Sequence, residues 1–419
     1  MRKIRDISLF LRDFSLNENL DLFASGQSSS ATAIDSIAFN GAKVTRYINE
    51  FWTSKQRQAS SIQEISYRAC FKPQLPHFFI DFLTQEDDVV YDPFSGRGTT
   101  VIEAGLMGRN VIANDINPLS RILTKPRFFV PDIGELKKRL AEMPIRTKTK
   151  ANLDLSMFYH RDTEAEIASL KEYLRQKHEN GNEDQLDSWI RMVATNRLTG
   201  HSKGFFSVYT LPPNQAVSPE SQMEINKKLK QKPEYRDTRN LILLKTRDLL
   251  RNLTEKQIGN LERAGGKARF FELDARETKR IRRGSVQLTV TSPPFLDIVD
   301  YHQDNWLRCW FNSIDDEKVA KKITMSKTLE EWSVVMLDVF RELRRITKEG
   351  GWVAFEVGEL RNGKIRLDEH VVPLGIEAGF RCEGIVINSQ QFTKTSNIWG
   401  IKNNQRGTNT NRIVLFHKD

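Results

Sequence analysis

The chain has 419 residues, of which 39% are hydrophobic and 28% are charged. That length and composition are typical of a soluble globular protein with one large domain, or with a core domain and an insertion. The net charge of +10 favours a polyanionic partner. The three cysteines are far apart and form no Cys-x-x-Cys pair, so neither a disulfide framework nor a metal site is expected.

Residues 1–65 are predicted to form an N-terminal helical arm. Residues 1–24 have the pattern of a short amphipathic helix whose charges exclude a signal peptide, and the serine-rich residues 25–30 read as a flexible link. Residues 42–66 place Val44 and Tyr47 on one helical face. No stretch of the chain approaches the ~18 apolar residues that a membrane span needs. We therefore expect a cytoplasmic protein without membrane contact.

A βαβ unit follows this arm. The apolar residues 88–92 predict a strand, a glycine-rich turn comes next, residues 99–107 predict a helix, and residues 110–115 predict a second buried strand. The crossover has the length that joins neighbouring strands of a parallel sheet.

The alternation of strands and helices stops after Pro118 and resumes late in the chain. Residues 120–267 are mostly helical in pattern and rich in lysine and arginine, whereas strands are predicted at 269–274, 286–291, 351–357 and 411–416. The simplest fold is a doubly wound, Rossmann-like α/β sheet built from residues 66–119 and 268–419. Residues 120–267 would then be a helical, basic insertion.

The glycine-rich turn is a candidate cofactor site. Gly96 and Gly98 follow a strand and open a helix, which lets the backbone turn tightly and lets a ligand approach closely. Asp115 ends the next strand, where a carboxylate can accept both ribose hydroxyls. Asp92 at the strand tip would repel a pyrophosphate but suits an ammonium group, and Phe94 can lie near a sulfonium. These features favour S-adenosylmethionine (SAM) over a dinucleotide; the alternative is a tight turn without a ligand.

A second special turn, Ser292-Pro293-Pro294-Phe295, ends the strand predicted at 286–291. Prolines cannot donate to the sheet, so two of them at a strand end create a rigid geometry. The Ser292 hydroxyl and the Pro293 carbonyl can accept the two hydrogens of an exocyclic amine, and Phe295 can stack on the ring that carries it. Fixed acceptors of this kind can stabilise an amine as it attacks a methyl group. An ordinary proline turn is the alternative.

These residues resemble the SAM-dependent DNA amino-methyltransferases. Residues 92–99 are similar to the family's cofactor motif, residues 292–295 to its catalytic motif, and residues 71–76 to the segment that packs on the methionine end of the cofactor. The resemblance implies that SAM is bound and S-adenosylhomocysteine released, and that no metal takes part. It implies catalytic roles for Ser292, Pro293, Pro294 and Phe295. It implies cofactor contacts for Lys72, Pro73, Asp92, Pro93, Phe94, Ser95, Gly96, Gly98, Thr99, Asp115, Ile116, Asp274 and Ala275, with Asp274 placed to accept from the adenine amine.

The resemblance also implies a partner and a product. Serine at the first catalytic position usually goes with cytosine N4 in this family, so we expect site-specific methylation of a flipped cytosine in double-stranded DNA, with a cognate restriction endonuclease as a possible companion. Adenine N6, an RNA base, and a nucleic-acid-binding protein without catalysis are the alternatives.

Two basic regions are candidate DNA contacts. The insertion at 120–267 lies where the family pattern does not predict a recognition segment, but its lysines and arginines can bind phosphates. The run at 279–283 directly precedes the catalytic strand and could hold the backbone near the flipped base. In both cases a solvated charged surface is the alternative.

Overall fold

The computed structural model describes residues 6–15, 31–39, 42–53, 59–68, 70–146, 149–210, 216–294, 301–323, 326, 328–360, 365–389 and 410–419. Within these residues a nine-stranded sheet has the order β1-β2-β10-β11-β7-β6-β3-β4-β5. Its strands are β1 (Ala33–Phe39), β2 (Ala42–Asn49), β3 (Val89–Asp92), β4 (Asn110–Asn114), β5 (Arg269–Phe271), β6 (Val286–Thr291), β7 (Thr347–Val357), β10 (Arg381–Ser389) and β11 (Thr410–His417). A separate two-stranded sheet pairs β8 (Glu359–Leu360) with β9 (Ile365–Arg366).

The central five strands are parallel and doubly wound. From β3 the chain adds β4 and β5 on one side, then crosses over and adds β6 and β7 on the other side. The strand order therefore reverses between β3 and β6, which pair directly through Val90 and Leu288. Ligands of open α/β sheets bind at the carboxyl ends of the strands where the order reverses. The predicted Rossmann-like α/β fold is confirmed, and Asp92 and Thr291 end the two strands at this point.

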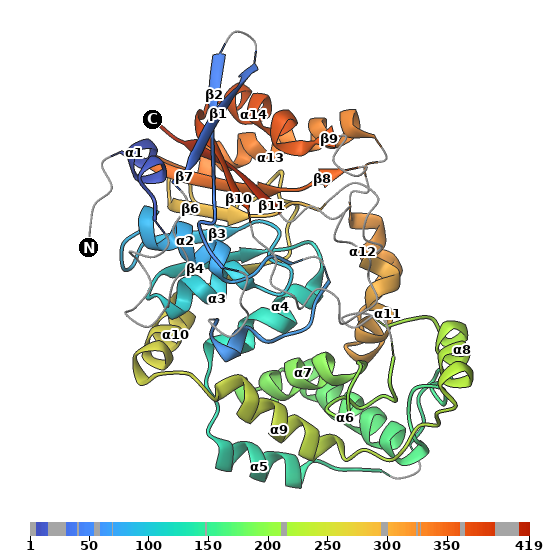
Figure 1. Ribbon diagram of the computed structural model, residues 1–419. Coiled ribbons are helices and arrows are strands. Elements are labelled where there is room, and N and C mark those ends of the chain that lie inside the picture. The colour runs from blue at the N-terminus through green and yellow to red at the C-terminus, as the bar shows by residue number, and fades with distance from the viewer. Residues whose placement is uncertain are drawn as a thin grey trace.

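Helices cover both faces of the sheet (Figure 1). One face carries α2 (Gln74–Leu83) and α3 (Thr99–Leu106), with α1 (Ile7–Arg12) beside β10. The other carries α13 (Leu329–Ile346) and α14 (Leu367–Glu377). Along β7, Ala354 belongs to the core on the first face, and Val353 and Phe355 belong to the core on the second. This strand is apolar on both sides because helices cover both sides.

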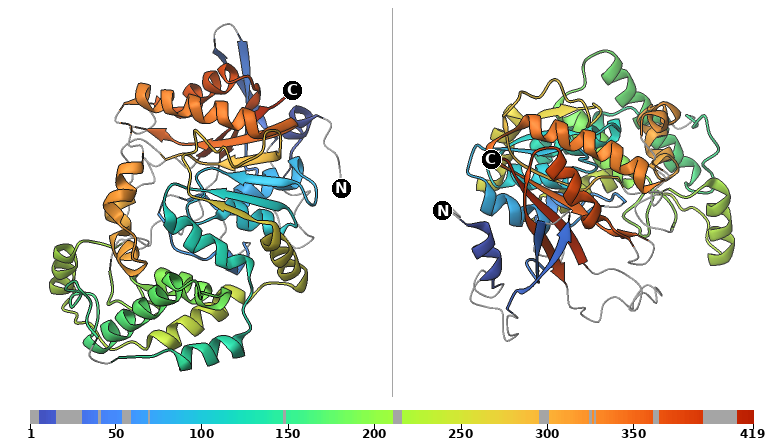
Figure 2. Two further views of the ribbon diagram at one scale, coloured as in Figure 1. Left: turned by 180° about the vertical axis from the view of Figure 1, so that it is seen from behind. Right: turned by 90° about the horizontal axis from the view of Figure 1, so that it is seen from above.

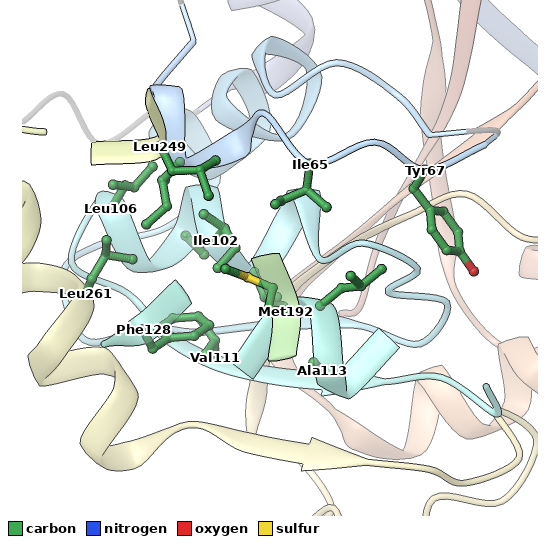
Figure 3. Packing of buried hydrophobic residues seen from close by; sticks show 14 of the residues in the cluster. Ile65, Tyr67, Ile102, Leu106, Val111, Ala113, Phe128, Met192, Leu249 and Leu261 are labelled. Carbon is green, nitrogen blue, oxygen red and sulfur yellow. The ribbon is translucent and has the colours of Figure 1, made fainter. Parts of the chain in front are cut away.

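The insertion is helical, as predicted. Its helices are α4 (Pro118–Thr124), α5 (Ile133–Glu142), α6 (Arg161–Glu179), α7 (Gln185–Arg197), α8 (Pro219–Leu229), α9 (Thr238–Leu250) and α10 (Glu255–Lys267). Most of them form a lobe beside the sheet, seen from two further sides in Figure 2. Met192 of α7 and Leu249 of α9 belong to the same apolar core as Ile102 of α3 (Figure 3). Helix α10 packs on α3 and leads into β5, so it is the crossover helix of the sheet. The division of the chain into units stays a prediction.

The N-terminal segment differs from the predicted helical arm. Helix α1 is present, but residues 42–49 form β2, which makes a hairpin with β1 and lies parallel to β10. The predicted helix at 42–66 is therefore wrong over these residues. Val44 and Tyr47 are buried in the cores on opposite faces of the sheet. Pairing with β10 overrides the helical spacing of the apolar residues. The segment is also rich in the β-branched and aromatic residues that strands favour.

Two more helices lie between β6 and β7 in the chain, before α13. They are α11 (Tyr301–Phe311) and α12 (Asp316–Lys322). No helix in the described part of the chain is long and apolar enough to cross a membrane. Nor do the described residues contain a group of three or more histidine, cysteine or acidic side chains arranged to hold a metal ion.

Candidate functional site

A pocket opens where the strand order reverses, and most of the predicted site residues line it. The wall contains, from the predicted cofactor set, Asp92, Pro93, Phe94, Ser95, Gly96, Thr99, Asp115, Ile116, Asp274 and Ala275, and from the predicted catalytic set Ser292, Pro293 and Pro294. The structure thus brings the two special turns to one cavity although about 200 residues separate them in the chain. Phe295 lies outside the described residues.

Three predicted cofactor residues do not line this pocket. Lys72 is exposed, and desolvation together with the nearby Arg97 lowers its pKa. Pro73 is buried at the start of α2. Gly98 belongs to the glycine-rich turn, and its backbone packs on the Thr124 side chain of α4. Pro73 and Gly98 therefore support the shape of the pocket rather than its surface.

Asp92 connects the two turns. Its side chain is 2% exposed, and its Oδ1 accepts hydrogen bonds from the Thr291 hydroxyl at 2.7 Å and the Phe94 amide at 3.1 Å. Burial raises the pKa of Asp92 to about 7, although these two hydrogen bonds act in the opposite direction. The hydroxyl of Thr100 on α3 donates to the Val290 carbonyl at 3.0 Å. The tips of β3 and β6 are therefore held together by side chains as well as by the sheet.

The turn after β3 needs glycine at Gly96 and Gly98 because both have positive φ, 49° and 79°. The Gly98 amide donates to the Ser95 carbonyl at 2.6 Å, and the Ser95 hydroxyl donates to the Asp92 carbonyl at 2.9 Å. A Cβ at Gly98 would lie 2.4 Å from the Thr124 side chain. The turn therefore has both a required backbone conformation and a tight packing contact.

We expect Gly98→Ala to destabilise the protein by about 2–4 kcal/mol, because a Cβ adds left-handed backbone strain to a steric overlap. The free energy of unfolding, measured by urea denaturation, checks this. Gly266→Ala in α10 is the matched control, since a Cβ there has nothing within 4 Å. Its stability should stay equal or rise, because alanine is the better helix residue. Equal stability of both variants would show that the turn is less tightly packed than the structure indicates.

Asp115 forms the floor of the cradle. Its Oδ2 accepts the Gly96 amide at 2.8 Å and its Oδ1 accepts the Asn117 amide at 2.9 Å. Burial raises the pKa of Asp115 to about 6, against these two hydrogen bonds. Each carboxylate oxygen can accept more than one hydrogen bond, so both retain capacity for a ligand hydroxyl.

Asp274 sits at the rim rather than inside the pocket. Its side chain is 42% exposed and pairs with Arg276, whose Nη2 lies 2.6 Å from Oδ2. The Arg276 guanidinium lowers the pKa of Asp274. Arg276 also lines the pocket. Arg276 was not predicted from the sequence. Its position two residues after Asp274 was the feature that could have indicated it. The adenine role of Asp274 stays a prediction.

A side chain of α13 holds the turn at Ser292–Pro294, which is predicted to be catalytic and is called the catalytic turn below. The indole Nε1 of Trp332 donates to the Pro294 carbonyl at 3.1 Å, and Trp332 is 3% exposed. The same side chain lines the pocket, together with Val335, Met336 and Val339. This apolar wall was not predicted, because in the sequence it reads only as the buried face of an amphipathic helix.

Glu356, on β7, is a further polar group beside the catalytic turn. Thr291 pairs with Phe355 across β6 and β7, so Ser292 and Glu356 occupy the next positions. Glu356 is 8% exposed and accepts from the Asn411 side-chain amide at 3.1 Å. Burial raises its pKa, while hydrogen bonds with Ser292 and Asn411 oppose this. The available signal was a lone acid within the apolar run at 351–357.

The basic run at 279–283 lies away from the catalytic turn. It precedes the amino end of β6, and the neighbouring Gly284 and Ser285 amides bond to the carbonyls of Arg345 and Ile346. Six residues of β6 separate that end from Ser292, which is about 20 Å at the usual rise of a strand. Arg282 and Arg283 thus lie at the opposite end of β6 from Ser292, and their contact with phosphates stays a prediction.

Comparisons with known proteins agree with this geometry. Residues 26–125 match the N6/N4 methyltransferase family, described as DNA methylase. The chain is 37% identical to Type II methyltransferase M.MjaII of Methanocaldococcus jannaschii over 82 residues, which are 20% of this chain and 16% of that protein. It is 27% identical to Type II methyltransferase M.MvaI of Kocuria varians over 128 residues, which are 30% of this chain and 25% of that protein. The chain thus matches a quarter or less of the length of these relatives.

Among solved structures, TrmN from Thermus thermophilus aligns with a TM-score of 0.31 and 13% identity, over 87% of this chain and 53% of that one. The assignment itself depends on the sequence matches, which include the glycine-rich turn and Asp115, and on the pocket that those residues line. Over residues 26–125 the chain is similar to the N6/N4 family described as DNA methylase, and the relatives named above are Type II methyltransferases.

Proposed function

We propose that this protein transfers a methyl group from SAM to the exocyclic N4 amine of a cytosine flipped out of duplex DNA. The observation that carries the proposal is the meeting of Asp92 and Ser292 at one pocket, with Thr291 hydrogen-bonded to Asp92 between them. This arrangement supports a reaction in which the cofactor lies over the first turn and the amine is held by the second. Similarity to two Type II methyltransferases supports a modification role. We further propose a cytoplasmic location and a cognate restriction endonuclease as a companion.

The cradle residues have distinct roles in this proposal. SAM, when bound, supplies an electrophilic methyl group on a sulfonium. The Asp92 carboxylate binds the ammonium of the methionine part, and Asp115 accepts the ribose hydroxyls. Phe94 offers a ring face to the positive charge. The apolar wall of Trp332 and Met336 excludes water from the reacting atoms, which strengthens the electrostatic contacts inside the pocket.

The catalytic turn acts on the amine. The Ser292 hydroxyl oxygen and the Pro293 carbonyl accept its two hydrogens and hold its lone pair toward the methyl group. As the nitrogen–carbon bond forms, the sulfur–carbon bond breaks and its electron pair stays on sulfur. The methylated nitrogen is then a strong acid and passes its proton to water as the site opens, so no strong base is required. Glu356, through Ser292, favours the orientation in which the hydroxyl oxygen faces the amine.

The direct test is the product. Purified protein is incubated with SAM and plasmid DNA, and the digested nucleosides are separated by mass spectrometry. N4-methylcytosine is the expected product. N6-methyladenine alone would overturn the base assignment, since both bases present an amine to the same two acceptors. Methylated RNA with unmodified DNA would overturn the substrate class.

We expect the affinity for SAM to fall as the pH drops from about 8 to about 5.5. The pKa of Asp92 is about 7, so the carboxylate that pairs with the ammonium is ionised only above that pH. Asp115, with a pKa of about 6, adds a smaller loss. Both pKa values lie above the unfolded value of 3.8. Without ligand, the contribution of Asp92 and Asp115 to the free energy of unfolding is therefore complete below pH 3.8. It is lost as the pH rises through their folded-state pKa values of about 7 and about 6.

Calorimetric titration of SAM across this pH range checks the expectation. Asp92→Asn should bind weakly at every pH and show a flatter profile, because the titrating charge is gone. A wild-type profile that is flat between pH 6 and 8 would mean that Asp92 does not pair with the cofactor.

A further inference from the structure

Helix α8 is held loosely at the edge of the helical lobe. The side-chain amides of Gln222 and Gln231 donate to the Tyr209 carbonyl at 3.1 and 2.8 Å, and that of Asn226 donates to the Met157 carbonyl at 2.7 Å. Gln222 is the buried residue of the helix, whereas Met223 and Leu229 are about half exposed. A helix attached by a few amides and little apolar packing presents most of its surface to a partner.

The exposed end of α8 carries the α8 lysine cluster, defined as Lys227, Lys228, Lys230 and Lys232. No described residue forms an ion pair or side-chain hydrogen bond with any of these four ammonium groups. The neighbouring arginines are instead engaged: Arg236 bonds to the Ser202 and Phe205 carbonyls, and Arg239 to the Met143 carbonyl. The cluster is therefore a group of cations left free within the described protein.

Helix stability alone does not account for this cluster. Lysines in the last turn of a helix interact favourably with its dipole, which covers Lys227 and Lys228. Lys230 and Lys232 follow the helix end, beyond that effect. Lys230 has a φ of 51°, a left-handed conformation usually taken by glycine or asparagine at this position. The charges of Lys230 and Lys232 therefore have no role in stabilising α8.

The segment that leads into α8 is anchored on α11. The Ala216 amide donates to the Asp304 carbonyl at 3.4 Å, and the Trp306 indole donates to the Val217 carbonyl at 3.3 Å. Both partners lie in the first half of α11, the helix that follows the catalytic turn in the chain. Figures 1 and 2 show α8, α11 and α12 along one side of the molecule.

The positive charge along that side suits duplex DNA. The 11 residues of α8 extend about 16 Å from this anchor at the rise of an α-helix. On α12, Lys321 and Lys322 are exposed, and Lys322 lines the catalytic pocket itself. Duplex DNA carries one negative charge per about 1.7 Å of its axis. A duplex that lies along this side of the molecule can therefore place phosphates on both α12 and α8.

We propose that the α8 lysine cluster binds the phosphate backbone of duplex DNA beside the flipped base, independently of base sequence. The proposal rests on the proposed function for its substrate, and it assigns to the insertion a clamp that holds the duplex while the base is out of the stack. Contacts of lysine with phosphate release bound counterions, so they should appear in the salt dependence of binding.

The test compares the wild type with K227Q/K228Q/K230Q/K232Q by fluorescence anisotropy on a labelled 30-base-pair duplex, over a series of salt concentrations. We expect affinity at low salt to fall roughly ten-fold or more, and the slope of log K against log salt to become shallower by about 0.9 for each phosphate that the variant no longer neutralises. The four lysine-to-arginine changes at the same positions should restore both values, because they restore the charge.

The matched control, K43Q/K137Q/K138Q/K256Q, removes four exposed lysines from the hairpin, α5 and α10, and should bind DNA as the wild type does. Circular dichroism and thermal unfolding identify any variant that has lost its fold. Equal affinity and slope in the α8 glutamine variant, or an equal loss in the control, would overturn the proposal. So would a loss confined to single-stranded RNA.

The outcomes also separate this proposal from the proposed function. If the wild type methylates DNA and the α8 glutamine variant binds DNA equally well, only the proposed phosphate contact of the α8 lysine cluster is refuted. A wild type that binds duplex DNA through α8 but produces no methylated base refutes the methyltransferase assignment alone. A wild type that does not bind duplex DNA refutes both.

Discussion

Ser292→Ala is expected to lower the rate of methyl transfer by about 10²–10³-fold, the usual effect of removing one fixed hydrogen-bonding group that stabilises a transition state. The hydroxyl accepts one hydrogen of the amine, and alanine offers no acceptor there. Single-turnover rates with saturating SAM and DNA measure this step apart from product release. Affinity for SAM should stay within about two-fold, since in the proposed complex Asp92 and Asp115, rather than Ser292, hold the cofactor.

Two further variants make the Ser292 result interpretable. Ser285→Ala removes the hydroxyl that donates to the Arg282 carbonyl just before β6, and should leave the rate unchanged. Glu356→Gln keeps the shape beside Ser292 but removes the charge, and should reduce the rate less than Ser292→Ala does. If Ser292→Ala weakened SAM binding as much as it slowed the reaction, the residue would shape the pocket rather than contact the amine.

The cofactor turn was predictable because its causes are local. Gly96, Gly98 and Asp92 lie within seven consecutive residues, and positive φ and a carboxylate at a strand tip can be read from such a short segment. The position of Ser292, Pro293 and Pro294 at a strand end was predictable for the same reason, while their catalytic role stays a prediction. The meeting of the two turns at one pocket followed from the parallel sheet, whose strands present their carboxyl ends at the same edge.

The residues that were missed depend on distant contacts. Trp332 reaches the Pro294 carbonyl from a helix 38 residues further along, and Glu356 gains its place only when β7 pairs with β6. The β1–β2 hairpin was taken for a helix because its partner β10 is more than 300 residues away. The Asn388 side chain accepts the Phe51 amide at 2.7 Å and so fixes the chain just after β2. No local pattern contains such a contact.

Asp115→Ala is expected to raise the dissociation constant for SAM by about 10²-fold or more. A hydrogen bond to a charged group contributes about 1.5–3 kcal/mol, and two ribose hydroxyls depend on this carboxylate in the proposed complex. The change also leaves the Gly96 and Asn117 amides without their acceptor. The cradle should therefore lose shape as well as a ligand contact, and calorimetry would measure the combined effect.

An analogue separates these two causes. S-adenosylhomocysteine without its 2′-hydroxyl should bind the wild type about 10-fold or more weakly than the parent compound, by the same hydrogen-bond value. Asp115→Ala should bind both compounds equally, because the partner of that hydroxyl is already absent. A double-mutant cycle of this form isolates the contact from the change in the turn. If the variant still discriminated between the two compounds as the wild type does, the ribose would be bound elsewhere and Asp115 would serve only to hold the Gly96 turn.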